Sequence, residues 1–287
     1  MPVPETGAVP TITGKDIALA ASADFEDFYL LEAGMKVEIV FENVGFPAFR
    51  PNETGGVIVI PQDMADEIID GPDKLHFHLL MIGHEIAHLV HEHGRAKDLL
   101  PDQDMALEYW ADFYGAKVMM MLVTYGQCLK RLYRRYYPGP IEFERPMESI
   151  GRAIGRLVTT VYRDHPRYPK KLLRVGLICN GVCSVLRREM PTADLIWYFS
   201  VYKRLFESQP VKELILFNAE DIEEGPGPLQ QVRRWHRETQ GDRRAISDGL
   251  RSEFLPFLHT TFDHSDEELA ENEAIRRAEL RAYGYDV

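Results

Sequence analysis

The sequence predicts a mainly helical α+β protein. Two short β-type runs lie near the N-terminus, at 36–41 and 55–61, and most of the chain after residue 62 has helical spacing of its apolar residues. Strands that come first and helices that follow favour an α+β arrangement over alternating strands and helices. The composition, 45% hydrophobic and 27% charged over 287 residues, is that of a globular chain that buries one large core or two modest ones.

The first predicted elements follow from local composition. Residues 1–14 are rich in Pro, Gly and Thr and are expected to form a flexible arm without a secretion signal. Apolar residues recur at helical spacing over 15–33, and Gly34 closes this predicted helix. KVEIVF at 36–41 alternates, and GGVIVIP at 55–61 is a β-branched run between glycine and proline, so both are predicted strands.

From residue 62 onward the periodicity predicts a series of helices. They are expected at 62–70, 73–93, 104–125, 127–136, 145–162, 169–188, 193–206, 210–218 and 229–238, with a break at EEGPGP. Ser265 and Glu268 form a capping box for a charged helix at 265–283. We therefore expect an arm at 1–14, one domain at 15–262 and a helical tail at 263–287.

Charge excludes some classes of partner. A net charge of −12 and a pI near 5.3 oppose binding to nucleic acid or anionic lipid, because both require a cationic surface. The basic stretch KRLYRRYY at 130–137 has helical spacing and is expected to be a solvated face over packed tyrosines. The most apolar run, VMMMLVTYG, is shorter than the roughly 20 residues that cross a bilayer.

The three cysteines indicate the compartment. Cys128, Cys179 and Cys183 are too few, and odd in number, for a disulfide framework, which favours a reducing environment. Cys179 and Cys183 share a helix face and are expected to be buried. We therefore expect a soluble cytoplasmic protein with neither nucleic acid nor membrane as a partner.

The stretch HEIAH at 84–88 has the spacing of a metal site. His84 and His88 are one helical turn apart, so both imidazoles can face one atom. Glu85 lies on an adjacent face, where its carboxylate can act as a general base toward a water molecule on that metal. Apolar neighbours suit a buried helix that holds a catalytic metal. The alternative is a solvated, histidine-rich helix end, because so short a pattern recurs by chance.

A second helix offers carboxylates. LEYWADFYGAK at 107–117 places Glu108 and Asp112 on one face of an apolar helix. Because catalytic zinc usually has three protein ligands, Glu108 is the expected third ligand, and Asp112 is expected to accept a hydrogen bond from a ligand histidine. Two carboxylates that face a core need a cation, which Zn²⁺ would supply. The alternative is an acidic first turn that favours the helix dipole, and Asp104 is explained as an N-cap.

The HEIAH and EYWAD motifs together resemble the HExxH plus ExxxD signature of gluzincin metallopeptidases. The resemblance is to the group that includes the HtpX and CAAX prenyl protease type and the soluble phage-exclusion peptidase Lit, and it covers residues from about 55 to 175. It implies a zincin-like metallopeptidase domain with a small N-terminal sheet and an active-site helix. It also implies a Zn²⁺ ion held by His84, His88 and Glu108.

The resemblance extends to a third motif. DHP at 164–166 is similar to the His-Pro motif of these families, in which the histidine, here His165, steadies the oxyanion. The families usually have an arginine about six residues later, where this chain has Lys171, with Arg174 one turn beyond. The alternative for His165 is a loop histidine before a proline.

A strand is the candidate for substrate binding. Zincin clefts bind extended peptides by strand addition, so the run at 55–61 is the candidate edge that pairs with substrate. Its candidate substrate-binding residues are Val57, Ile58 and Val59. The alternative is an ordinary buried strand.

The other histidines near the motif are given structural roles. The metzincin pattern requires a further histidine where this chain has Gly94, so His91 and His93 are not ligands of that type. They are expected at the helix C-terminus, partly charged and favoured by the dipole, with Gly94 as C-cap. His76 and His78 are expected to be surface or satisfied polar residues.

These residues predict a zinc-dependent endopeptidase that acts on a protein or peptide substrate. Zinc would polarise the scissile carbonyl and lower the pKa of its bound water toward about 7, with Glu85 transferring the proton and His165 as a second donor to the oxyanion. Two other classes stay open: an inactive zincin-fold regulatory or binding protein, and a helical interaction protein without metal. Intact Glu85 argues against the first and the paired carboxylates against the second. The sequence makes no prediction of oligomeric state.

Overall fold

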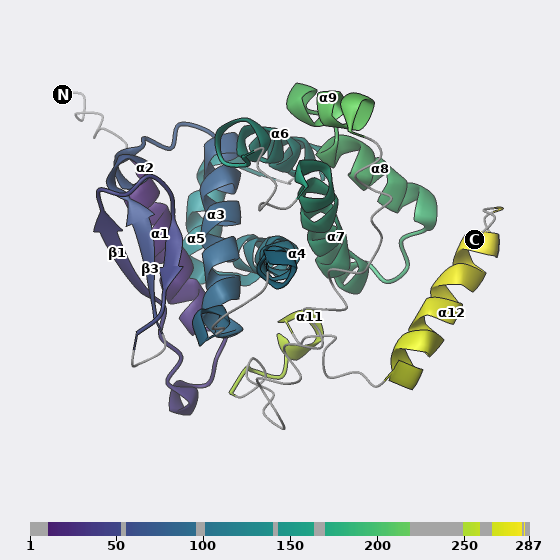
Figure 1. The fold of residues 1–287 in the computed structure, drawn as a ribbon, viewed down its shortest axis with the longest axis horizontal. Coiled ribbons are helices and arrows are strands. Elements are labelled where there is room, and N and C mark those ends of the chain that lie inside the picture. The colour runs from purple at the N-terminus through teal and green to yellow at the C-terminus, as the bar shows by residue number, and fades with distance from the viewer. Residues whose placement is uncertain are drawn as a thin grey trace, which may run out of the picture.

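The computed structural model describes residues 11–52, 56–95, 101–139, 143–163, 170–218, 249–258, 266–282 and 284. Within these residues the chain is mainly helical with one small mixed sheet, so the predicted α+β class is confirmed. Figure 1 shows the sheet and the first helix on one side of the molecule and the other helices beside them. Among the described helices, none combines the length and apolarity that crossing a bilayer requires. The helix predicted at 229–238 lies outside the described residues.

The sheet has a central strand that the sequence analysis placed at an edge. Its strands are β1 (Glu38–Glu42), β2 (Ala48–Arg50) and β3 (Val57–Pro61), in the order β1-β3-β2. β3 is parallel to β1 and antiparallel to β2, and its Ile58, Val59 and Ile60 are buried. The strands predicted at 36–41 and 55–61 are confirmed, whereas the three-residue β2 was not predicted.

The first helix is shorter than the predicted one at 15–33. Helix α1 (Gly14–Glu26) stops because the following backbone pairs with the C-terminal part of the chain; the N–H of Leu30 donates to the carbonyl of Gly249 at 2.7 Å. A 3-10 turn, η1 (Leu31–Ala33), comes next and ends at Gly34, whose φ of 63° is left-handed. Gly34, which was predicted to end the helix at 15–33, instead ends η1.

The N-terminal arm is also shorter than predicted. Ile12 is buried, and Thr13 caps α1 in a reciprocal capping box with Asp16. Thr13 forms an antiparallel bridge with Ile68 as well. Residues 11–14 therefore belong to the domain, and residues 1–10 lie outside the described part of the chain.

The helices after the sheet follow the predicted order. They are α2 (Gln62–Asp66), α3 (Pro72–Val90), α4 (Pro101–Tyr125), α5 (Gln127–Tyr136), α6 (Glu144–Thr160), α7 (Lys171–Glu189), α8 (Leu195–Leu205), α9 (Gln209–Phe217), α11 (Leu255–Leu258) and α12 (Asp266–Ala282). Their bounds lie within a few residues of the predictions, except that α2 ends before residue 70 and α11 was not predicted. Figure 1 shows α12 apart from the other helices, and its Ile275 is exposed.

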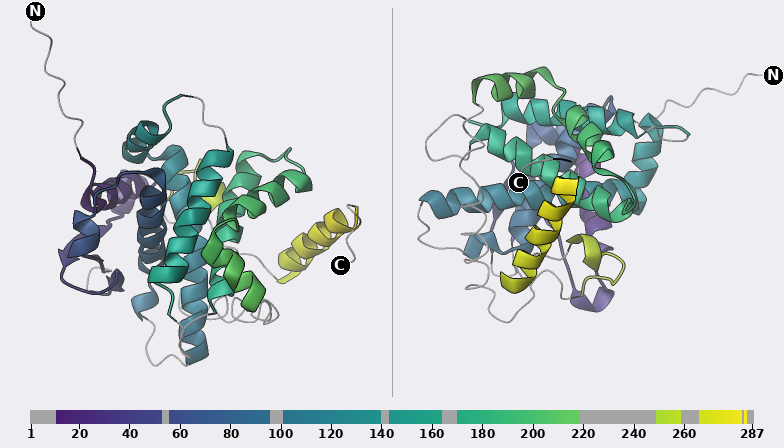
Figure 2. Two further views of the ribbon diagram at one scale, coloured as in Figure 1. Left: turned by 90° about the horizontal axis from the view of Figure 1, so that it is seen from above. Right: turned by 90° about the vertical axis from the view of Figure 1, so that its right-hand side faces the viewer.

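Helix α4 passes through the middle of the helical layer, between α3 and α7 (Figures 1 and 2). Two glycines allow its close approach to α3. A Cβ on Gly83 would lie 2.4 Å from the carbonyl oxygen of Gly115, and a Cβ on Gly115 would lie 2.6 Å from the backbone nitrogen of His84. This contact sets the polar positions of α4 directly beside the HEIAH turn of α3.

Two smaller predictions are confirmed. Cys179 and Cys183 are both buried in α7. On α5, Arg131 and Arg134 are exposed whereas Tyr133 is buried, so the basic stretch is a solvated face over packed tyrosine.

Candidate metal centre

Two histidine rings at the end of α3 point toward one spot. His84 and His88 are one turn apart, and their Nε2 atoms lie 3.1 Å from each other. Ile86 and Ala87, between them in the sequence, are fully buried and hold this turn against the core. The i and i+4 spacing thus brings both imidazoles together, as the sequence predicts.

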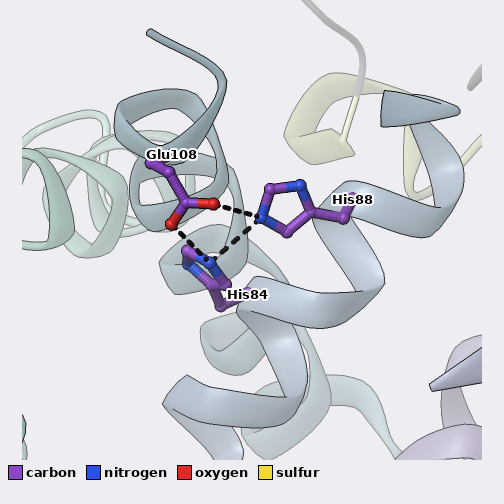
Figure 3. Close-up of side chains that lie close together, drawn as sticks. All are labelled: His84, His88 and Glu108. Carbon is purple, nitrogen blue, oxygen red and sulfur yellow. Dashed lines mark hydrogen bonds and ion pairs between the residues drawn. The ribbon is translucent and has the colours of Figure 1, made fainter. Parts of the chain in front are cut away.

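A carboxylate from α4 completes the group. Glu108 Oε2 lies 3.4 Å from His84 Nε2, and Glu108 Oε1 lies 3.4 Å from His88 Nε2 (Figure 3). One ligand atom from each of the three residues falls within 4.8 Å of the others. Among the described residues this is the one group of histidine, cysteine or carboxylate side chains with the spacing to hold a metal ion.

The charged groups around His84 and Glu108 favour a cation at this site. Burial lowers the pKa of His84, but hydrogen bonds and charges from Asp112 and Glu108 outweigh burial and raise this pKa to about 10. Burial also opposes ionisation of Glu108, yet both histidines hold its pKa well below the usual range. The carboxylates beside His84 thus favour a positive charge among these side chains.

Asp112 lies beside His84, on the side away from Glu108 and His88. The Nδ1–H of His84 donates to Asp112 Oδ1 at 3.0 Å, which is the contact that the sequence analysis expects. Asp112 is buried, and Arg174 of α7 forks onto it with distances of 2.5 Å to Oδ2 and 3.0 Å to Oδ1. The expectation that zinc compensates both carboxylates needs correction, because the Arg174 guanidinium already neutralises Asp112.

Arg174 is held in place by a tyrosine as well. Its guanidinium carbon lies 4.0 Å from the centre of the Tyr162 ring, and the Tyr162 hydroxyl lies 3.4 Å from Asp112 Oδ1. Arg174 was expected only as a departure from a family motif, and no role was predicted for Tyr162. Neither has a local pattern that reveals it, because both come from segments distant from HEIAH.

Replacing Arg174 by methionine is expected to destabilise the metal-free protein by about 3 kcal/mol, because it leaves the Asp112 carboxylate buried without its partner. Adding Asp112→Asn to Arg174→Met should recover part of this loss, since the uncompensated charge is then gone. Urea unfolding of the two variants and of wild type measures both effects. Equal stability of Arg174→Met and wild type would show that the pair does not stabilise the fold.

Glu85 lies on the wall of the same cavity as the three-residue group. Its side chain is buried and accepts a hydrogen bond from the backbone N–H of Phe49 in β2. Burial raises the pKa of its carboxyl above the usual value, although His84 and His88 oppose this. A carboxylate that is destabilised by burial is a better proton acceptor than one in water.

The cavity is lined by both polar and apolar side chains. Its volume is about 440 Å³. The candidate ligands and Glu85 form part of its lining, and apolar side chains form another part of the wall: Leu80, Met81, Leu107, Leu157, Val161 and Ile178. Such a wall can receive a bulky apolar side chain close to the polar group.

The predicted substrate-binding strand is corrected by the sheet topology. Val57, Ile58 and Val59 belong to β3, whose two edges are already paired with β1 and β2. A strand with both edges paired has no free backbone groups for another chain. Ala48 and Phe49 of the edge strand β2 line the cavity instead. At three residues, β2 is too short to show the alternation that predicts strands.

Two further candidate residues are His165 and Asp104. His165 lies outside the described residues. Asp104 is an exposed residue within the first turn of α4 that lines the cavity, so it is not the N-cap. Glu108 and Asp112 lie further along α4, which excludes the alternative of an acidic first turn for this pair.

The other histidines of the described residues, His76, His78, His91 and His93, are buried. His76 contacts Ser149 Oγ at 2.8 Å and His78 contacts Glu67 Oε2 at 2.9 Å, so both are satisfied polar residues. Burial lowers the pKa of His91 to about 3, which corrects the expectation of a partly charged ring at the helix end. His93 contacts His88, a role that the sequence analysis missed.

The site defines this chain as a mainly helical α+β protein with a candidate metal centre of two histidines and a glutamate. Comparison with protein-family models, with curated proteins and with solved structures gives no match. What can be inferred about function therefore rests on the residues around His84, His88 and Glu108.

Proposed function

We propose that this protein is a zinc-dependent endopeptidase of the gluzincin type, with a zincin-like domain. His84, His88 and Glu108 are the proposed zinc ligands, and Glu85 is the proposed general base. The proposed substrate is a peptide segment of a protein that enters the cavity beside β2.

The observation that carries this proposal is the spacing of the three side chains. Tetrahedral zinc with bonds of about 2.0 to 2.1 Å holds its ligand atoms about 3.3 Å from one another. The two Nε2 atoms are 3.1 Å apart, and each lies 3.4 Å from a different oxygen of the Glu108 carboxylate, distances close to that value. Three protein ligands leave a fourth position open, which is the arrangement of catalytic rather than structural zinc.

The roles of the residues follow from their positions. Zinc, when bound, would supply Lewis acidity toward the substrate carbonyl and toward a water molecule. Glu85, in the same cavity, takes a proton from the attacking water and delivers it to the leaving amine. Asp112 fixes the ring of His84 with Nε2 toward the cavity, and Arg174 keeps Asp112 ionised. His165 stays the proposed second donor to the carbonyl oxygen.

The walls of the cavity favour an extended substrate. β2 is an edge strand beside Glu85, and its outer edge, where the Phe49 N–H donates to Glu85, is the proposed place for a substrate strand to add by backbone hydrogen bonding. The apolar lining residues Leu157, Val161 and Ile178 favour a bulky apolar side chain near the cleaved bond.

Metal removal tests the proposal directly. We expect the purified protein to carry one zinc ion per chain and to hydrolyse a mixed peptide library, with cleavage lost on chelation and restored by zinc. Elemental analysis and mass spectrometry of the peptides measure both properties. A protein that neither carries zinc nor takes it up after chelation would exclude the proposed centre.

One observation favours a metal-free alternative. Arg174 Nη2 lies 3.6 Å from Glu108 Oε2, so a protein cation already stands near the third candidate ligand. A helical binding protein could use the same ion pair to fill the site. Retained zinc without cleavage of any peptide would instead favour the inactive zincin-fold regulator.

A further inference from the structure

The two candidate ligand histidines have different partners on their outer ring nitrogens. Nδ1 of His84 faces the Asp112 carboxylate, whereas Nδ1 of His88 lies 2.7 Å from Nδ1 of His93. The rings of His88 and His93 meet edge to face, with centroids 4.8 Å apart and planes at 79°. The contact between His88 and His93 joins two imidazoles, so the donor is whichever ring carries the proton on Nδ1.

The position of the proton between His88 and His93 affects the candidate metal centre. A nitrogen–nitrogen contact of 2.7 Å is a hydrogen bond, so one ring donates and the other accepts. If His88 donates from Nδ1, its neutral ring has a lone pair on Nε2, which faces His84 and Glu108. If His93 donates instead, the proton of neutral His88 sits on Nε2 and blocks coordination.

The fold fixes His93 in this position. After α3 ends at Val90, Glu92 adopts a left-handed φ of 54°, which turns the chain back into η2 (His93–Arg95). A left-handed φ is strained for any residue other than glycine, so the surrounding packing has to hold Glu92 in this conformation. His93 is buried by this turn, at 6% exposure.

Neighbouring groups leave the turn little freedom. The His91 ring is hydrogen-bonded at both nitrogens, to Ala87 O at 2.8 Å and to the Trp110 N–H at 3.1 Å, and its centroid lies 5.5 Å from that of the tilted His93 ring. A Cβ on Gly94 would lie 2.6 Å from Pro51, so only glycine lets η2 approach the end of β2.

We propose that His93 is a positioning residue that accepts a hydrogen bond from Nδ1 of His88 and thereby directs the Nε2 lone pair of His88 toward the metal. This inference rests on the proposed metal centre. It adds that an uncharged imidazole orients the second histidine, whereas a carboxylate orients the first. Loss of the acceptor on His93 should weaken zinc affinity by about 10- to 100-fold, as for other groups that orient a ligand.

Two variants separate hydrogen bonding from packing. His93→Phe keeps an aromatic ring in the turn but has no acceptor, so we expect the full loss of affinity. His93→Gln keeps an acceptor oxygen, so we expect zinc affinity closer to wild type. His78→Gln is the matched control, since His78 is buried on α3, the helix that carries His88, but bonds Glu67 and does not line the cavity. Competition with a chromophoric chelator measures each affinity.

A second measurement needs no variant. Nitrogen-15 NMR of the metal-free protein should show the proton of His88 on Nδ1 in wild type and a larger Nε2–H population in His93→Phe. A purely structural role for His93 would leave this tautomer unchanged. Zinc bound equally tightly by His93→Phe and wild type, or an Nε2–H tautomer of His88 in wild type, overturns the inference alone. No zinc binding by wild type overturns the proposed function and the inference with it.

Discussion

Replacing Glu85 by glutamine is expected to abolish peptide hydrolysis while zinc stays bound. Glu85 is assigned proton transfer and no coordination, so its loss should lower kcat by a factor of about 10² to 10⁴ or more without removing a ligand. Glutamine is the sharp substitution because its side-chain oxygen can still accept the hydrogen bond from Phe49. Peptide cleavage and zinc content, measured on one preparation, give the result.

The Glu85→Gln variant should also remain folded. Burial disfavours the charged form of Glu85, so a neutral amide of the same size removes a cost from the folded state. Urea unfolding of the metal-free variant should therefore show a free energy of unfolding at least equal to that of wild type. Equal peptidase activity in variant and wild type would remove the peptidase assignment, and loss of zinc would make Glu85 a ligand.

Removing Glu108 is expected to strip the metal. Glu108→Ala deletes the carboxylate that lies 3.4 Å from both Nε2 atoms, and two histidines on one helix turn are then left to bind zinc. The variant should be isolated essentially metal-free. Glu108→Gln is the matched control for shape, because it keeps the side-chain length while losing the negative charge that offsets zinc.

Two other acids on α4 rank below Glu108. Asp112→Ala should be partly loaded and slow, with affinity or activity down by about 10- to 100-fold, because it orients His84 without facing the metal. Asp112→Asn is the cleaner form of this test, since alanine also leaves Arg174 without its main partner. Asp104→Ala should resemble wild type, because Asp104 is exposed.

Zinc content of the purified variants decides the ligand assignment. The expected order of occupancy is Asp104→Ala, then Asp112→Asn, then Glu108→Ala. Full occupancy in Glu108→Ala, or complete loss only in Asp104→Ala, would assign the third ligand to another residue and would contradict the gluzincin proposal.

Local periodicity predicted most helices because it is a property of neighbouring residues. α5 (Gln127–Tyr136) has the predicted bounds, and α7 (Lys171–Glu189) lies close to them. The predicted elements were wrong where the backbone pairs with another segment of the chain. α1 ends early because the chain after it pairs with Gly249, and the edge strand β2 exists only through its pairing with β3. Gly249 is distant in sequence from α1, so no local pattern could show that pairing, whereas β3 follows β2 closely and the three-residue β2 is simply too short to show strand alternation.

The sequence by itself determined which side chains share a helix face. His84 with His88, and Glu108 with Asp112, are four residues apart, and helix geometry alone orients each pair in one direction. Only the tertiary structure decided that the two faces meet, because that depends on the glycine contact between α3 and α4.

The partners of these faces were likewise decided by packing. Arg174 reaches Asp112 across 62 residues of chain, and His93 reaches His88 through a left-handed turn. The order β1-β3-β2 made β2, rather than β3, the edge strand beside the cavity. Periodicity specifies the direction of a side chain from its own element, whereas the atom that it meets depends on how separate elements pack.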